Sequence, residues 1–289
     1  MRNLQYTFTF LLLLFIGLMS CDENIVEYDA EPISNVAEFQ LHYFVPVTAT
    51  STNNIYKVEI NDQLYANDKA PLSTYNVIPN GSVGRFYTTT IGTNNIKLYK
   101  STDLELVYNQ NCTLTEGKQN IFVYDFNKPP IVFDNGFPYE SNVTEYSDTT
   151  AWIKFYNFLF ESGDIPTNLK LQYQYQYPIE YDSKGVVIRK SEWTNLGTPV
   201  SFGESTGWMP VIVHKSILIS SGYARLDYKI KVIDANGNDT GDLQIMNSSS
   251  KFVNYSDYWN AYIGRRYHHV ISGMRAAKPT SAVRQFTAL

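Results

Sequence analysis

A serine between two glycines is the first residue that could carry chemistry. Gly203-Glu204-Ser205-Thr206-Gly207 matches the G-x-S-x-G pattern of a nucleophile elbow. Side chains that could complete a catalytic triad follow in the chain order of a hydrolase: Asp234, His268 and His269. The elbow needs a helix after the serine, yet the β-branched run 211–213 favours a strand. We therefore expect a polar turn and no catalytic residue, with a serine hydrolase using Ser205 as the alternative.

Oxygen-bearing side chains at alternate positions raise the question of a metal site. Residues 234–242 resemble a calcium loop, but Asp239 stands at the sixth place, where an EF-hand needs glycine, and no glutamate closes the loop. Asn236-Gly237 is instead a strong hairpin-turn signal. His268 and His269 would point to opposite faces of a strand, so they cannot both bind one metal. We predict a turn, no metal site and no cofactor.

Aromatic side chains in polar stretches are the remaining candidates for a site. Six of them lie in the second half of the chain, namely Trp193, Trp208, Tyr255, Tyr258, Trp259 and Tyr262. Flat rings beside hydrogen-bonding groups could stack on sugars, or they could pack loops onto sheets with their polar atoms reaching water. Both interpretations stay open for these six. The alternating tyrosines of residues 173–177 are expected to form a sheet face, with the glutamines between them on the wet side.

Short alternating segments must position these residues. Residues 38–45, 56–60 and 169–177 alternate between apolar and polar side chains, residues 96–99 and 121–124 are further short strand-like segments, and polar turns separate them. This pattern, together with 23 Tyr and 16 Phe, is typical of a β-sandwich. We find no helical face of any length.

The pattern runs through the chain twice. Residues 151–156 are similar in kind to 38–44, and 264–271 echo 117–124. Two copies of one unit explain this, with longer loops in the second. The sequence predicts a first β-sandwich domain at 36–133, a linker at 134–150, a second domain at 151–274 and a tail at 275–289. The predicted fold is all-β, with two tandem immunoglobulin-like sandwiches.

One part of the chain is similar to a known family. Phe86-Tyr87, then residues 91–99, then Leu114-Thr115-Glu116-Gly117-Lys118 and 121–123 resemble the domain-of-unknown-function 4397 family. That family is common in surface lipoproteins of Bacteroidota and has an immunoglobulin-like sandwich character. The resemblance covers about residues 36–130, and 151–273 more loosely. It implies a fold and a location, and it carries no site residue.

The start of the chain predicts a lipid anchor. Leu18-Met19-Ser20-Cys21 closes an apolar run and resembles a lipobox, which implies that residues 1–20 are a lipoprotein signal peptide and that Cys21 carries the lipid. The run is shorter than the roughly 20 apolar residues of a spanning helix. Five carboxylates lie in residues 22–31, so 21–35 is expected to be an extended, solvated tether. The segment also resembles the acidic export signal of Bacteroidota surface lipoproteins.

Composition argues against nucleic-acid binding and indicates the role of Cys112. The net charge is −5, and no basic stripe of the kind that nucleic-acid binding requires is present. With Cys21 acylated, Cys112 has no partner in the chain and is expected to be a small apolar core residue.

The residues together predict a non-enzymatic lipoprotein anchored to the outer membrane through Cys21, facing the cell exterior, with a binding or adhesive role. A lipoprotein that captures glycans for a nutrient-uptake system is the alternative, and a protein ligand or a subunit of a surface fibre also stays open.

Overall fold

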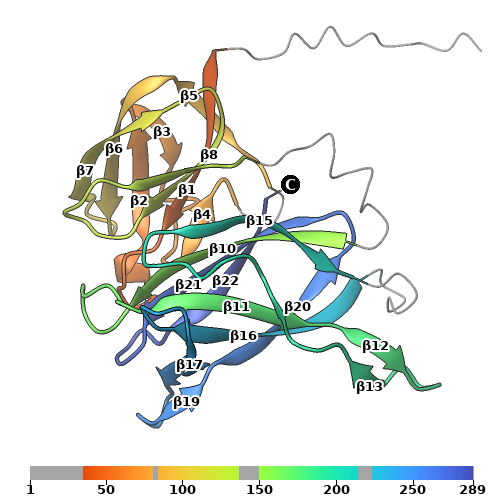
Figure 1. Ribbon diagram of the computed structural model, residues 1–289. Coiled ribbons are helices and arrows are strands. Elements are labelled where there is room, and N and C mark those ends of the chain that lie inside the picture. Colours follow the sequence, from red (N-terminus) through yellow and green to blue (C-terminus); the bar gives the residue numbers. More distant parts are fainter. Residues whose placement is uncertain (1–34, 81–83, 137–149, 214–222, 289) are drawn as a thin grey trace, which may run out of the picture. The chain divides into compact units, whose positions relative to one another are not determined.

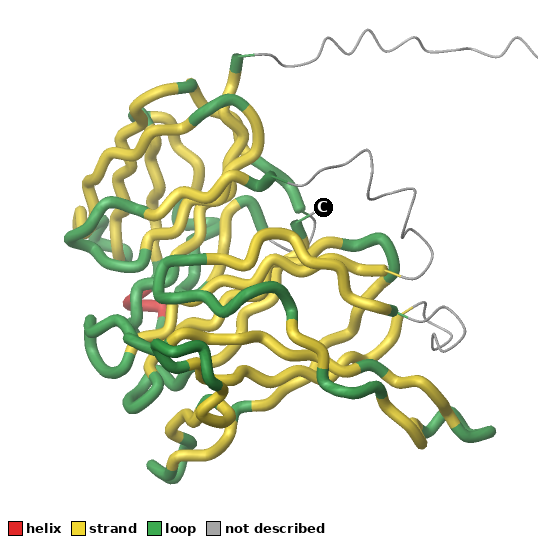
Figure 2. The backbone as a smooth tube through the Cα atoms, viewed as in Figure 1, coloured by secondary structure: helices red, strands yellow, loops and turns green. Residues whose placement is uncertain are grey.

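The described residues form strands and one short helical turn. The computed structural model describes residues 35–80, 84–136, 150–213 and 223–288 (Figure 1). Strands dominate this part of the chain, and the helical turn is the 3-10 element η1 (Ser51–Asn53) (Figure 2). The predicted all-β sandwich class is confirmed. Cys21, the signal peptide and the tether up to residue 34 lie outside the described residues.

The first half of the chain forms two sheets. Sheet I has the order β3-β2-β6-β7, built from β3 (Gln63–Ala66), β2 (Ile55–Ile60), β6 (Gly92–Lys100) and β7 (Glu105–Leu114). Sheet II has the order β4-β1-β8-β9, with β5 also paired to β1, and its strands are β4 (Asn76–Ile78), β1 (Val36–Tyr43), β8 (Gly117–Val123), β9 (Ile131–Asp134) and β5 (Tyr87–Thr90). We call these two sheets the first sheet pair.

The second half also forms two main sheets, the second sheet pair. Sheet III has the order β15-β10-β21-β22, from β15 (Ser205–Ile212), β10 (Thr150–Phe160), β21 (Arg266–Met274) and β22 (Ala282–Thr287). Sheet IV has the order β14-β11-β16-β17, with β20 also paired to β16, from β14 (Thr194–Asn195), β11 (Lys170–Gln176), β16 (Tyr223–Ile233), β17 (Asp239–Asp242) and β20 (Ser256–Tyr262). Two hairpins extend from it, β12 (Pro178–Tyr181) with β13 (Val187–Lys190), and β18 (Gln244–Met246) with β19 (Phe252–Asn254).

The two sheet pairs repeat one strand order. In sheet II, β1 and β8 pair in parallel, and in sheet III β10 and β21 do the same. In sheet I, β6 lies between β2 and β7, just as β16 lies between β11 and β20 in sheet IV. These are the segments whose sequences echo one another. The predicted domain boundaries stay a prediction, because contacts between the two pairs group residues 35–289 as one compact unit.

Each pair encloses a core, and a third apolar layer lies between the pairs. Val58 and Leu98 of sheet I meet Leu41 of sheet II in the first core, and Phe155 of sheet III meets Tyr173 of sheet IV in the second. The third layer joins sheets II and III, which gives the stacking order I, II, III, IV (Figure 1). Its aromatic members are Phe44, Tyr75, Phe122, Tyr156, Phe158 and Phe286. We call it the inner layer.

The inner layer explains why β10 and β21 lack an alternating sequence. Every residue of both strands is buried, because sheet II covers one face of sheet III and sheet IV covers the other. A strand that is buried on both faces reads as a nearly continuous apolar run. In the inner layer the ring of Phe158 stacks on that of Phe122, with 4.7 Å between centroids.

The structure also describes the predicted tail, the ends of the predicted linker and Cys112. The predicted tail contains β22, which pairs antiparallel with β21. Most of the predicted linker lies outside the described residues, but Asp134 ends β9 and Thr150 begins β10. Cys112 is buried in the first core as predicted, and burial raises the pKa of its thiol to about 11.

Candidate functional site

Two of the six candidate aromatics lie inside the second core. Trp259 exposes 2% of its surface, and its ring lies 4.8 Å from that of Tyr267 and 4.9 Å from that of His269. Antiparallel pairing sets Trp259 opposite Leu226 on the inward face of sheet IV. The hydroxyl of Tyr255 accepts a hydrogen bond from the N–H of Val283, at 2.8 Å. Both side chains therefore pack the fold.

Trp208 lies elsewhere, on β15 at the edge of the inner layer. Its indole N–H donates to the backbone carbonyl of Asn135, at the end of sheet II. Its ring centroid lies 5.1 Å from that of His268. Trp208 thus links sheets II and III and does not share a surface with Trp193 or Trp259.

The other three aromatics gather on the solvent side of sheet IV. Strand β16 alternates, so that Leu226, Tyr228 and Ile230 enter the core while Tyr223, Arg225, Asp227 and Lys229 face outward. Tyr262 pairs with Tyr223, and their rings lie 5.5 Å apart. Tyr258 lies on the same strand as Tyr262 and is 46% exposed. Trp193 covers Lys229, whose Nζ is 4.7 Å from the ring centroid. We call this surface the sheet IV face.

A pocket opens on the sheet IV face beside Trp193 and Tyr258. Its volume is about 320 Å³. Besides the two rings, its lining includes a side-chain amide and three charged groups, from Gln176, Arg225, Asp227 and Asp257. Trp193 comes from the loop before β14 and Tyr258 from β20, so two segments far apart in sequence supply the aromatic parts. In such a pocket, a flat aromatic ring can contact the apolar face of a ligand ring. The neighbouring amide, carboxylate and guanidinium groups can hydrogen-bond to the polar groups at the edge of that ligand.

Electrostatic contacts order the charged groups around the pocket. The Nε of Arg225 donates to Asp227 at 3.3 Å, and Lys190 also donates to Asp227. The guanidinium carbon of Arg225 lies 3.7 Å from the ring centroid of Tyr258, a close cation–π contact. Exposed ion pairs of this kind contribute roughly 0–1 kcal/mol to stability, so a ligand can replace them at little cost to the fold.

Ion pairs continue along β16 beyond the pocket. Lys231 pairs with Asp239 at 2.9 Å and with Asp242 at 3.1 Å. The hydrogen bond with Asp239 raises the pKa of Lys231 and lowers that of Asp239, so both groups are charged at neutral pH. The sheet IV face is therefore a mosaic of both signs of charge, with aromatic rings between them.

Sequence reasoning did not single out Arg225 or Asp227. Both lie in the first half of β16, where the alternation of buried and outward residues begins at Tyr223. Extending that alternation would have placed them with Lys229 on one outward row. Their neighbourhood with Trp193 and Tyr258 depends on strand pairing, which no short sequence motif records.

The residues considered for catalysis belong to different strands: Ser205 to β15, and His268 and His269 to β21, while Asp234 follows β16. Ser205 begins β15, so a strand follows it where an elbow needs a helix. His268 and His269 point to opposite faces, as predicted. The Tyr156 hydroxyl is hydrogen-bonded to Nδ1 of His268 at 2.9 Å, and the Tyr173 hydroxyl to Nδ1 of His269 at 3.0 Å.

Burial determines the charge state of these histidines. Because desolvation disfavours the charged form, it lowers the pKa of His269 to about 3 and that of His268 well below its usual value. His42 of sheet II, stacked on Phe122 at 4.2 Å, has its pKa lowered to about 3 for the same reason. All three imidazoles are therefore neutral at neutral pH.

The loop considered for calcium forms the predicted turn. Asp234 Oδ1 accepts hydrogen bonds from the N–H groups of Asn236 and Asn238, both at 2.8 Å, and Gly237 has a φ of 86°. These backbone donors lower the pKa of Asp234. Within the described ranges, no group of three or more His, Cys, Asp or Glu side chains could hold a metal ion.

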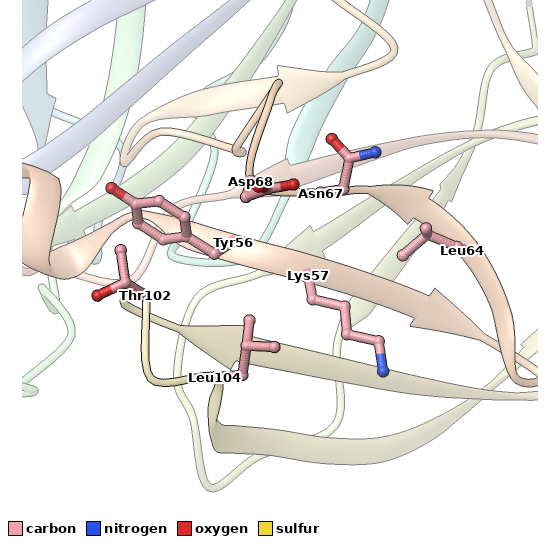
Figure 3. Close-up of a pocket in the computed structure, with 7 residues that line it drawn as sticks. All are labelled: Tyr56, Lys57, Leu64, Asn67, Asp68, Thr102 and Leu104. Atoms are coloured by element: carbon pink, nitrogen blue, oxygen red, sulfur yellow. The ribbon is translucent and has the colours of Figure 1, made fainter.

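A second pocket lies on the outer side of sheet I. Its volume is about 340 Å³, and Figure 3 shows its seven lining residues, which come from β2, β3 and two nearby turns. Leu64 and Leu104 are 51% and 45% exposed. Lys57 is paired with Glu59 at 2.7 Å. This pocket is more apolar than the one on the sheet IV face, and no aromatic pair flanks it.

Comparisons with known proteins do not assign this chain to a family. No family model matches the chain, so the resemblance to the 4397 family stays a prediction. No curated protein matches it either. Among solved structures, a proposed cell adhesion protein from Bacteroides fragilis covers 87% of this chain and 97% of its own, with 10% identity and a TM-score of 0.25. At that TM-score the likeness supports no argument about fold or function. Among the described residues, no helix is long and apolar enough to span a membrane.

Proposed function

We propose that this protein is a non-enzymatic surface lipoprotein, anchored to the outer membrane through Cys21, that binds an external ligand on the sheet IV face. The observation that carries the proposal is the pocket beside Trp193 and Tyr258. Its rings come from loop and edge-strand segments on the solvent side of a buried scaffold, which suits ligand binding without disturbing the core.

Among possible ligands, the pocket favours a glycan. The ring of Tyr258 is exposed, and that of Trp193 is half-buried against Lys229. Exposed rings can receive the C–H faces of a sugar, while Gln176 and the two aspartates can bond to its hydroxyls. A protein ligand would use the same rings as anchors.

Binding of a polysaccharide panel by full-length protein purified in detergent tests the proposal. We expect Trp193→Ala and Tyr258→Ala each to weaken binding at least about tenfold, or about 1.4 kcal/mol. Phe252→Ala is the matched control, because Phe252 is an exposed aromatic on β19 and is not among the pocket residues. Glycan binding that both pocket variants leave intact would contradict this site. If no glycan binds, a protein ligand becomes the better hypothesis.

Surface display is tested separately. We expect protease added to intact cells to degrade the protein, and Cys21→Ser to abolish palmitate labelling and release or misprocess the chain. Protection in intact cells, with loss only after lysis, would exclude display at the exterior. Palmitate labelling that persists in Cys21→Ser would exclude the anchor.

A further inference from the structure

Arg225 is held in place on the sheet IV face by two contacts. Its guanidinium lies over the ring of Tyr258, at 3.7 Å, and its Nε donates to Asp227. Asp227 is in turn bonded to Lys190 from β13. An arginine side chain has about 2 kcal/mol of rotamer entropy. Contacts that already restrict it reduce what a ligand must supply to order it.

The two Nη groups of Arg225 lie side by side on one edge of the guanidinium and are available to a ligand. Within the described residues its hydrogen bonding goes through Nε alone. The two Nη groups have no protein acceptor there, and Arg225 lines the pocket. Paired Nη donors match the two oxygens of a planar carboxylate, which can then form two parallel charge-assisted hydrogen bonds.

The charges around Arg225 permit an anion. Asp227 lies between two cations, Arg225 and Lys190, while Lys229, whose ammonium lies over Trp193, is paired with Asp242 at 3.4 Å. Asp257 also lines the pocket, and it accepts hydrogen bonds from the N–H of Tyr258 at 2.8 Å and from the hydroxyl of Tyr228 at 3.4 Å. That carboxylate can accept a sugar hydroxyl but would repel an anion placed beside it. The position for a ligand carboxylate is therefore at the Nη edge of Arg225.

We infer that the pocket binds a carboxylated sugar, with its carboxylate on the two Nη groups of Arg225 and its ring against Trp193 or Tyr258. This inference rests on the proposed glycan-binding function and names the class of glycan. It differs from a general attraction between cations and anions, because the guanidinium fork and not charge alone would select the ligand.

Oligogalacturonate and a neutral galactose oligomer of equal length are the two main probes, tested on the full-length protein in detergent. We expect Arg225→Gln to weaken oligogalacturonate binding at least tenfold. Arg225→Lys keeps the charge but loses the fork, and we expect it to weaken binding at least threefold. Arg189→Gln on β13 is the control, because Arg189 is exposed and pairs with Glu180 away from the pocket. Thermal unfolding of each variant verifies that it folds.

The outcomes separate the inference from the proposed function. If the neutral oligomer binds as tightly as oligogalacturonate, or if Arg225→Gln leaves the difference unchanged, the carboxylate site is wrong while glycan binding stands. Equal weakening by Arg189→Gln would show non-specific charge attraction and would overturn the inference. Equal binding of a sulfated galactan would exclude carboxylate selectivity, and equal binding of polyglutamate would exclude a sugar-specific site. If no sugar binds, the proposed glycan function itself fails.

Discussion

The core of the first sheet pair consists largely of aliphatic side chains such as Val58, Ile60 and Leu98. The core of the second pair is also mainly aliphatic, but it adds a larger set of aromatic rings, among them Tyr173, Tyr228, Tyr255 and Trp259, with the buried His269 against them. Both cores lie in the same strand order, so the difference is one of side-chain chemistry. One scaffold accepts either filling provided that the inward positions are apolar enough and the polar tips find partners.

The outer faces differ in the same way. On sheet I, exposed Leu64 and Leu104 line an apolar pocket, whereas the sheet IV face carries Trp193, Tyr258 and Arg225. Aromatic rings and charged groups can orient a ligand and select it, whereas leucine side chains contribute only apolar contact area. The two sheet pairs therefore share a strand order but differ in their outer surfaces. The candidate site belongs to the second pair only.

The largest expected effect contrasts two tryptophans. Trp259→Ala should reduce the free energy of unfolding by about 3–5 kcal/mol, because it empties a buried site. Trp193→Ala should cost about 1 kcal/mol or less, since its ring lies at the surface. Urea denaturation measures both. A large loss from Trp193→Ala would mean that Trp193 is a structural residue, and the distinction between core and face would fail.

We expect the inner layer to make the two sheet pairs unfold together. Phe158→Ala should cost about 3 kcal/mol, because Phe158 stacks on Phe122 between sheets II and III. All four tryptophans follow residue 150, so their fluorescence reports on the second pair and, through Trp208, on its contact with Asn135 of sheet II. We expect the fluorescence and far-ultraviolet transitions to coincide in the wild type and to separate in the variant. Separate transitions in the wild type would show that the layer does not couple the pairs.

Low pH should reduce the stability of the fold through the histidines that are buried in the inner layer and the second core. The unfolded chain binds protons at its histidines below pH 6.5, whereas His42 and His269 in the folded chain stay neutral down to about pH 3. Stability is therefore lost as pH falls below 6.5, by on the order of 1 kcal/mol per buried histidine between pH 7 and 5.5. The slope of unfolding free energy against pH should decrease in His269→Gln relative to the wild type. An unchanged slope would contradict neutral burial.

The smallest effect concerns the sheet I pocket. Leu104 has a φ of 57°, in the left-handed region that is unfavourable for a residue with a side chain. Leu104→Gly should raise stability by about 0.5 kcal/mol, since relief of this strain exceeds the entropy that glycine adds to the unfolded chain. Thermal unfolding measures the gain. Leu64→Ala, at an exposed position on β3, should change stability by less than about 0.5 kcal/mol and is the control.

Much of the architecture could be predicted from local pattern. The alternation at 169–177 correctly indicated a tyrosine face turned inward, and Asn236-Gly237 correctly indicated a turn. The echo between residues 117–124 and 264–271 marked β8 and β21, which occupy matching places in their sheets. Local periodicity predicts these features because each depends on neighbouring residues and on one buried face.

The candidate site was predicted only in part. Six aromatics were named together, and the fold divides them among the core, the inner layer and the sheet IV face. Tyr258 and Trp259 illustrate the reason, since they are adjacent in sequence but lie on opposite faces of β20. Which face of an edge strand is covered depends on the partner sheet. Arg225 and Trp193 come together only through the pairing of distant strands.

The sequence by itself determined the all-β class, the places of several strands along the chain and the inward face of β11, because alternation of side chains is a local property of a strand. It also predicts the anchor at Cys21. Tertiary structure decided that sheets II and III bury a shared aromatic layer, that Trp259 is a core residue, and that Trp193, Tyr258 and Arg225 meet at one pocket. These outcomes depend on how sheets stack and which strands become neighbours, and such non-local contacts are set by the packing of the whole chain.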